Sequence, residues 1–337
     1  MSKEKIIEEA NSNLDKAAAA AAGAASASEF TATWAKMIPL FYQVGKGGAP
    51  TPAMLQRNVN SLKARNLFVN KTAATMSAGD WGTVLSLANS GITAGDNVFT
   101  VRSDVNGLIF TNGQLVMGRT QSNIAGGATY KLSEHWVQEF KTGDKHKAQN
   151  TKITIFYTGQ ADRGNAHFTR YALVDGGTGL AGVAIYANSS PGAYEMYVAV
   201  NNEENELMKA EALINTNQID AGLARVDAIR NAQGAGLTAV SATGLTLTQA
   251  REELRRERRI VCAFRGFSFY DARRWGVCEP TSSGGGRTGA VLLSNTSVLS
   301  TNGTIEYGYL DYWDVPGNEL TYNPASAIST PVVNPKK

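Results

Sequence analysis

The sequence predicts a mainly α protein, built from helical hairpins with long loops and a few short β-strands. Three observations carry this prediction. Apolar residues recur at helical spacing in several segments, glycine- and proline-rich stretches such as 45–52 interrupt them, and short β-rich runs gather in 94–195. The 34 glycines and nine prolines among the 337 residues fit a chain with much loop.

Composition narrows the class of protein but gives no function. With 43% hydrophobic and 18% charged residues, the chain has the composition of a soluble globular protein and not of a disordered one. No apolar stretch approaches the ~18 residues of a membrane-spanning helix. A net charge of +3 does not by itself indicate a nucleic acid or a membrane surface as partner. The N-terminus lacks the apolar core of an export signal, so we expect either an intracellular protein or a trimmed chain.

The first third of the chain predicts three helices. Residues 3–25 place isoleucine, leucine and alanine on one stripe and end in an alanine run with high helix propensity. Residues 52–69 and 79–88 form the second and third helices. Because only a few residues join these two, they predict an antiparallel hairpin, the unit of helical-repeat proteins.

The middle of the chain changes character. In 94–195 the apolar runs NVFTV, ITIFY and GVAIYA predict short strands, and one helix over 133–140 interrupts them. Helices then return at 201–216 and 218–231, separated by a very short turn.

Two further helices follow before the chain becomes irregular. Thr246 and Gln249 have capping-box spacing and predict the start of a helix that continues to Phe264. A short helix covers 267–275. From 279 onward the sequence predicts mostly loop.

The sequence Gly177-Thr-Gly-Leu-Ala-Gly182 matches a dinucleotide-binding fingerprint, which needs a helix directly after it to hold the pyrophosphate. Here VAIYAN follows, and this run favours a strand. We therefore expect a strand–turn–strand and no cofactor site.

The basic run 251–259 (REELRRERR) contains glutamates three and four residues before arginines, as in ion pairs on one helix face. An ion network is therefore favoured over a phosphate site. Glu257 alone falls on the apolar stripe, where a carboxylate is costly unless it is paired. We expect Glu257 to be buried against an arginine of the 265–274 segment, with Arg273 and Arg274 as candidates.

Residues with metal-binding or catalytic chemistry do not form a site in the sequence. Cys262 and Cys278 are not in a C-x-x-C pair, and His135, His146 and His167 have no zinc-ligand spacing. A disulfide between the cysteines is an open but less favoured alternative. Because no pair of carboxylates has spacing that suggests hydrolysis, we expect no metal, no cofactor and no enzymatic activity.

A ligand site is predicted in the loop-rich part of 94–195. Arg119, Asn123 and Tyr130 bring a cationic donor, an amide and an aromatic face together within twelve positions, which is the mixture that a sugar ring needs. Trp136 is a further candidate, although its apolar neighbours favour a core position. That the polar residues merely bind loop backbone is an equally open interpretation.

Several segments together resemble one family. The helix pair 204–213 (ENELMKAEAL) and 222–230 (GLARVDAIR), followed by 257–276 (ERRIVCAFRGFSFYDARRWG), is similar to the signature of SusD/RagB-like outer-membrane proteins. Residues 133–144 and 312–324 resemble two further segments of that family. Arg265 and Ser268 are among the positions that depart from its usual residues.

The resemblance implies a single domain over 1–337 with a tetratricopeptide-like scaffold, and it implies no chemistry. Its expected parts are helical hairpins (1–93), a ligand-facing loop and strand region (94–195), signature hairpins (196–277) and a C-terminal loop region (278–337). Members are lipid-anchored on the outer face of the outer membrane, bind glycans and pair with a TonB-dependent, SusC-like transporter. Two alternatives stay open: a RagB-like cargo of peptide or glycoprotein, and a helical-repeat scaffold for protein partners. No nucleic-acid partner is expected.

Overall fold

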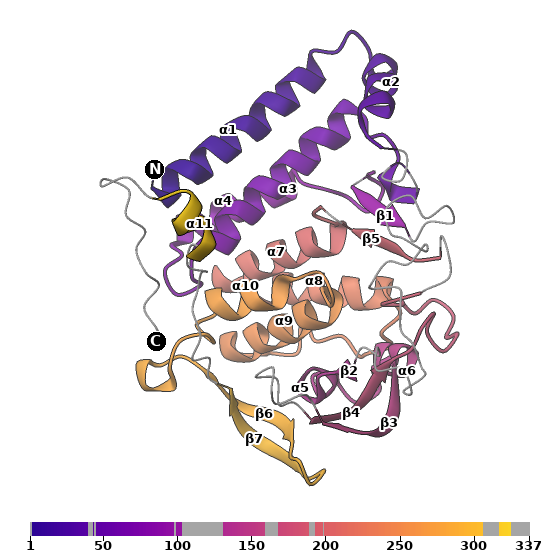
Figure 1. Cartoon of the computed structure of the whole chain (residues 1–337), viewed down its shortest axis with the longest axis vertical. Helices are drawn as coiled ribbons and strands as arrows, with labels where there is room; N and C mark the ends of the chain where they lie inside the picture. Colours follow the sequence, from indigo (N-terminus) through magenta and orange to yellow (C-terminus); the bar gives the residue numbers. More distant parts are fainter. Residues whose placement is uncertain are drawn as a thin grey trace.

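The computed structural model describes residues 2–39, 43, 45–97, 99–102, 131–158, 168–188, 193–197, 199–305 and 317–324. Helices stack from the top of the view toward its middle, and the small sheets lie to their right and below them (Figure 1). The helices are α1 (Lys3–Ala22), α2 (Ala27–Met37), α3 (Pro52–Asn70), α4 (Ala78–Asn89), α5 (Glu134–Val137), α6 (Lys145–Asn150), α7 (Asn202–Asn215), α8 (Ile219–Ala232), α9 (Leu247–Val261), α10 (Phe267–Arg274) and α11 (Gly317–Tyr322). The mainly α fold with short strands is confirmed.

The strands form three small antiparallel sheets with the orders β1-β5, β2-β4-β3 and β6-β7. Their bounds are β1 (Thr100–Arg102), β2 (Lys131–Leu132), β3 (Thr151–Thr158), β4 (Phe168–Leu173), β5 (Glu195–Tyr197), β6 (Arg287–Leu293) and β7 (Leu299–Ile305). The first sheet pairs Val101 with Met196 and so joins two segments that are far apart in the sequence.

The helices form a continuous stack, in which α1 contacts α3, α3 contacts α4, α4 contacts α7, and α7 contacts both α8 and α9. Side-chain caps explain several of the predicted helix starts. Ser77 and Thr246 each form a capping box, and Thr51 accepts a hydrogen bond from the backbone of Met54 at 3.2 Å. These caps satisfy backbone N–H groups that the first helical turn leaves open.

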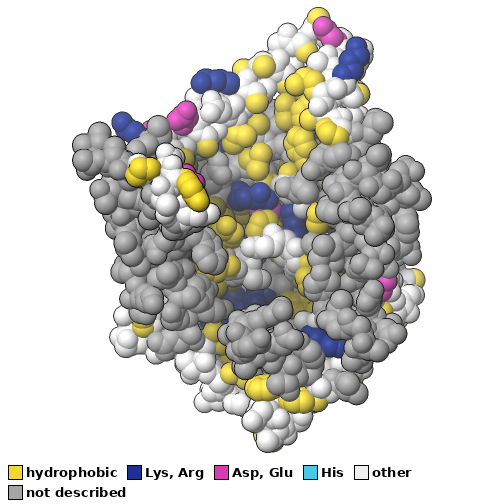
Figure 2. All heavy atoms as spheres, viewed as in Figure 1, with side chains coloured by type: hydrophobic (Ala, Val, Ile, Leu, Met, Phe, Trp, Pro, Cys, Tyr) yellow, Lys and Arg dark blue, Asp and Glu magenta, His cyan; other side chains and the backbone are white. Residues whose placement is uncertain are grey.

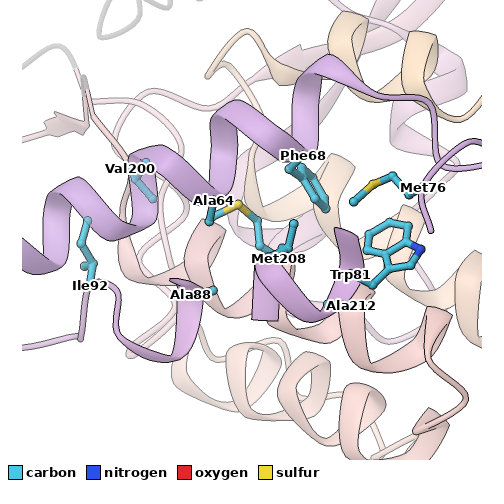
Figure 3. Close-up of a cluster of buried hydrophobic side chains, with 10 residues drawn as sticks. Ala64, Phe68, Met76, Trp81, Ala88, Ile92, Val200, Met208 and Ala212 are labelled. Atoms are coloured by element: carbon cyan, nitrogen blue, oxygen red, sulfur yellow. The ribbon is translucent and has the colours of Figure 1, made fainter. Parts of the chain in front are cut away.

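The core between α3, α4 and α7 is a cluster of buried side chains (Figure 3). Phe68 and Trp81 meet edge to face with their ring centroids 6.3 Å apart, a favourable aromatic geometry. A second cluster joins α7, α8 and α9 along the apolar stripes that the sequence predicts, with Leu207, Leu223 and Leu254 at most 1% exposed. Burial of these faces holds the stack together.

Glu257 is buried, as predicted, but the predicted partner is wrong. Its carboxylate accepts a hydrogen bond from Nε of Arg230 on α8 at 2.6 Å. Arg274 donates instead to Glu211 on α7, and its guanidinium lies 3.8 Å from the centroid of the Phe68 ring. Glu257 therefore faces α8, whereas Arg274 contacts α7 and α3. The predicted ion network along 251–259 is confirmed by pairs such as Arg255 with Glu252 at 2.7 Å.

Several expectations differ from the structure. The helix expected over 133–140 is shorter and forms α5, and a separate helix, α6, starts after an N-cap on Asp144. The region after 279 contains the β6–β7 hairpin, where mostly loop was expected.

The glycine motif at 177–182 also differs, because the described residues 174–188 contain turns and no strand. Gly177, Gly179 and Gly182 have φ values of 71°, 85° and 73°, and this left-handed backbone is incompatible with a regular strand. No helix follows the motif within 183–188 either, so the geometry of a dinucleotide site is missing there.

Two more findings concern the cysteines and the helices. Cys262 and Cys278 are both buried thiols, so the alternative of a disulfide between them is not realised. Among the helices that the structure describes, none has both the length and the hydropathy needed to cross a membrane.

Candidate ligand-binding site

A pocket of about 370 Å³ opens where the ends of α8 and α9 meet β5 and the 182–186 segment. We call it the tyrosine pocket, because three tyrosines line it. The polar and aromatic residues of its wall are Tyr186, Tyr194, Tyr197, Glu195, Asn201, Glu203, Gln233 and Arg265. These residues come from three separate parts of the sequence, 186–203, 233 and 265, so only the folded chain brings them together.

Strand β5 holds one wall of the pocket in place. Its pairing with β1 fixes Tyr197 opposite Thr100. The Glu195 carboxylate accepts hydrogen bonds from the backbone N–H of Lys46 at 2.6 Å and from the Thr100 hydroxyl at 2.7 Å. Because Glu195 is anchored and Tyr197 pairs with Thr100, Tyr197 lies on a fixed strand rather than on a free loop.

The opposite wall is held by Asn150, the last residue of α6. Its side chain accepts a hydrogen bond from the backbone N–H of Tyr186 at 2.8 Å and donates to the carbonyl of Ala184 at 2.9 Å. Gly234, with φ of 72°, lies so close to this wall that an added Cβ would be 2.3 Å from the Gly182 carbonyl oxygen. Only glycine permits this approach.

Arg265 has hydrogen-bonding capacity that the described residues do not use. Its Nη2 donates to the Ala199 carbonyl at 2.7 Å, and its guanidinium lies 5.0 Å and 5.7 Å from the ring centroids of Phe267 and Tyr197. Its Nε and Nη1 are buried and have no hydrogen-bond partner among the described residues.

The hydroxyl of Tyr186 and Oε1 of Gln233 are likewise buried and have no hydrogen-bond partner among the described residues. Such buried atoms are rare in folded proteins, because each costs free energy while it lacks a partner. Four of them belong to residues that line this one pocket.

The three tyrosines keep their phenolic protons at neutral pH. Burial raises the pKa of Tyr186 well above its ordinary value and also raises the pKa of Tyr194. Burial, together with the nearby carboxylates of Glu203 and Glu195, raises the pKa of Tyr197 to about 12. Each phenol can therefore both donate and accept a hydrogen bond beside an aromatic face.

Of the predicted site residues, Arg119, Asn123 and Tyr130 lie outside the described residues. Trp136 packs in a hydrophobic cluster, with its ring centroid 5.0 Å from Phe140 and 6.0 Å from both Tyr186 and Phe264. Its indole N–H donates to the carbonyl of Arg259 at 2.9 Å. The structure thus places Trp136 next to a tyrosine of the pocket, with its one polar group already bonded.

Sequence reasoning missed the tyrosine pocket, although one signal was available. Tyr186, Tyr194 and Tyr197 flank the Gly-, Ser- and Asn-rich stretch NSSPGA, the same setting that singled out Tyr130. Gln233 and Arg265 gave no such signal, because their place in the pocket depends on how α8 and α9 pack.

A second hollow, of about 750 Å³, lies over α3 between α1 and α4. Ile7, Leu67 and Leu87 give it apolar patches, with Lys3 and Lys63 among its charged residues. Figure 2 shows hydrophobic side chains along this end of the molecule and a further hollow in the middle of the same face. The tyrosine pocket is smaller but carries the buried unpartnered groups, so we take it as the candidate site.

Comparison with known proteins gives one match to a family and several to solved structures. Residues 204–326, from α7 through α11, match the SusD family model. No curated protein matches the sequence.

Among solved structures, a SusD-like protein from Bacteroides fragilis aligns with 99% of this chain and 71% of its own, at 15% identity and a TM-score of 0.56. A SusD homolog from Bacteroides thetaiotaomicron aligns with 82% of this chain and 60% of its own, at 14% identity and a TM-score of 0.50. A SusD-like carbohydrate binding protein from Bacteroides vulgatus aligns with 81% and 60%, at 12% identity and a TM-score of 0.45. The chain thus spans less than two thirds of the length of two of these three proteins.

Proposed function

Because residues 204–326 match the SusD family model and the fold resembles solved SusD-like structures, we propose that the chain is a SusD/RagB-like protein that binds an oligosaccharide and delivers it to a TonB-dependent transporter, without catalysing a reaction. The observation that carries the binding part is the tyrosine pocket with its unpartnered buried groups on Arg265, Tyr186 and Gln233. The proposal that the chain delivers the oligosaccharide to a transporter rests on the family resemblance.

The chemistry of the pocket fits a sugar. A pyranose ring presents an apolar C–H face, which packs on an aromatic ring, and hydroxyls, which both donate and accept hydrogen bonds. Tyr194 and Tyr197 offer rings, while Arg265 offers two N–H donors and Gln233 an acceptor. These groups match a polyol better than an apolar ligand.

The charges of the pocket favour a neutral sugar. Glu195 and Glu203 line it together with Arg265, whose guanidinium is already 3.6 Å from the Glu204 carboxylate. An acidic ligand would meet carboxylates here, and their repulsion in a partly dry pocket would oppose its binding.

The cellular setting is part of the proposal. We place the full-length protein on the outer face of the outer membrane, held by a lipid anchor and paired with a SusC-like transporter. We propose further ligand contacts for Arg119, Asn123 and Tyr130. Trp136 would hold Tyr186 in place through the contact between their rings.

The test is isothermal titration calorimetry of the full chain against a panel of neutral oligosaccharides. We expect at least one to bind, and Tyr197→Ala to weaken it by about 1–3 kcal/mol. Tyr270→Ala is the matched control, because that tyrosine is 47% exposed and does not line the pocket; it should leave the affinity unchanged.

Other results would favour the alternatives. Binding of peptides or glycoproteins, and of no glycan, would replace the cargo while keeping the transport role. A pull-down that recovers protein partners but no transporter would favour a helical-repeat scaffold. Glycosidase turnover abolished by one carboxylate substitution would contradict the non-enzymatic assignment.

A further inference from the structure

A second pocket, of about 200 Å³, lies between α9, α10 and the β6–β7 hairpin. We call it the arginine pocket, because Arg255, Arg259 and Arg287 line it. His135, Ser268, Phe269 and Trp275 are among the other residues of its wall, and no aspartate or glutamate lines it in the part of the chain that the structure describes. Its volume corresponds to about seven liquid waters at ~30 Å³ each, so it has room for one small ligand group such as a single sugar ring.

The three guanidiniums are held in place by carboxylates that do not line the pocket. Arg255 donates to Glu139 at 2.7 Å and 3.0 Å and to Glu252 at 2.7 Å. Arg287 donates to Glu252 at 3.1 Å and 3.2 Å, and Arg259 donates to Glu139. Because these bonds fix the arginine side chains before any ligand arrives, an incoming group would not have to order them.

The hydrogen bonds between these arginines and glutamates leave one buried donor unused. Nε of Arg287 is buried and has no hydrogen-bond partner among the described residues. A guanidinium that served only to join β6 to α9 would be expected to have its buried N–H groups satisfied. The unused donor can bind an acceptor that the described residues do not supply.

The imidazole of His135 is neutral and therefore adds no charge to the wall of the arginine pocket. Its Nε2 lies 2.8 Å from Nη1 of Arg259. Since a guanidinium can only donate, the imidazole accepts this bond and carries its proton on Nδ1. Phe269 and Trp275 provide apolar surface, and the Trp275 indole is fixed by a hydrogen bond to Glu211 at 3.1 Å.

We propose that the arginine pocket binds a compact anionic group, a carboxylate or a sulfate, carried on a small ring such as an acidic sugar. The planar fork of arginine matches the two oxygens of such a group. The aromatic side chains would pack against the ring that carries it. This site is separate from the tyrosine pocket, whose carboxylate-bearing wall favours a neutral ligand, and the proposal does not depend on the function assigned to that pocket.

The experiment is calorimetric titration of the full chain, at low ionic strength, with sodium glucuronate, sodium sulfate and glucose. We expect glucuronate, sulfate or both to bind, and Arg287→Gln to weaken that binding by about tenfold or more. The matched control is Arg273→Gln on α10, whose guanidinium lies over Tyr270 and does not line the pocket; its affinity should equal that of the wild type. Tyr197→Ala should also leave this binding unchanged, which separates it from sugar binding in the tyrosine pocket.

Two results would overturn the proposal. One is a folded wild-type protein that binds neither anion, and the other is an Arg287→Gln protein that binds as the wild type does. Should Arg287→Gln fail to fold by circular dichroism, wild-type crystals soaked in selenate decide the matter. An anomalous peak within hydrogen-bond reach of Arg287 and Arg255 supports the site, and peaks only elsewhere refute it.

Discussion

Glu257 of α9 accepts a hydrogen bond from Nε of Arg230 of α8 at 2.6 Å, and each residue is only 2% exposed. Arg230 also donates to Glu253 at 2.9 Å. Burial raises the pKa of the Glu257 carboxyl, while Arg230 opposes that rise. The pair sits beside the apolar contacts of α8 and α9 and fixes how these two helices meet.

Replacing Glu257 with Ala should lower the free energy of unfolding by about 3 kcal/mol. Removing one partner of a buried ion pair costs about 3–5 kcal/mol of unfolding free energy. We expect a value at the lower end of this range, because Arg230 keeps its contact with Glu253. Urea unfolding measures the change. Asp15→Ala is the control, since its pair with Lys63 is exposed and should be worth less than about 1 kcal/mol. Equal effects of the two substitutions would show that the buried pair has no special role.

Gly222→Ala should destabilise the α7–α8 hairpin by about 1–3 kcal/mol. A Cβ at this position would lie 2.7 Å from the Ala210 carbonyl oxygen and 2.6 Å from the Ile214 side chain, so the two helices would have to separate. Gly82→Ala, in α4, is the matched control. Its Cβ would meet nothing within 4 Å, and the higher helix propensity of alanine should stabilise by about 0.5–1 kcal/mol. Melting temperatures that shift in the same direction for both variants would argue against close packing at Gly222.

His135 should stay neutral down to about pH 4. Burial, followed by the charge of Arg259, lowers its pKa from 6.5 to about 4. In the unfolded chain the imidazole takes up a proton near its ordinary pKa, so this group stabilises the fold fully above about pH 6.5. That contribution is lost as the pH falls from about 6.5 toward 4. An NMR titration should give a midpoint near 4, and His135→Gln should remove this part of the pH dependence of stability. A midpoint near 6.5 would show that the imidazole is not buried beside the arginines.

Tyr130→Ala tests the predicted loop site independently of the tyrosine pocket. We expect a loss of about 1–3 kcal/mol in glycan affinity with a nearly unchanged melting temperature, because the residue would contact ligand rather than core. Calorimetry and thermal unfolding of the same sample measure both quantities. A lower melting temperature with unchanged affinity would assign Tyr130 to packing and leave recognition to Tyr197 and its neighbours.

The helices with a buried apolar stripe and a side-chain cap could be predicted from sequence. Residues 52–69 and 201–216 are examples, since their periodicity reflects burial against neighbouring helices. By contrast, α2 was not predicted, although Phe30, Trp34 and Met37 recur at helical spacing, and it has no buried residue. Its cap was still readable, because Ser26 accepts a hydrogen bond from the backbone of Glu29, three residues later. The β6–β7 hairpin was missed because β7 is exposed along most of its length and shows no alternation.

The partner of Glu257 and the tyrosine pocket lay beyond the sequence for a different reason. Glu257 and Arg230 are 27 positions apart, and the rotation of α8 against α9 decides which arginine of several it meets. The pocket likewise needs Gln233, Tyr197 and Arg265 from three separate segments. Local patterns predict which face of an element is buried, whereas a site assembled from many segments depends on their final arrangement.

The most direct test of sugar binding is a crystal structure of the full chain with the oligosaccharide that binds best. We predict a sugar ring packed on Tyr197 or Tyr194, with hydroxyls within hydrogen-bond distance of Nε or Nη1 of Arg265 and Oε1 of Gln233. A ligand bound elsewhere, such as in the hollow between α1 and α4, with the tyrosine pocket empty, would contradict the assignment of the binding site.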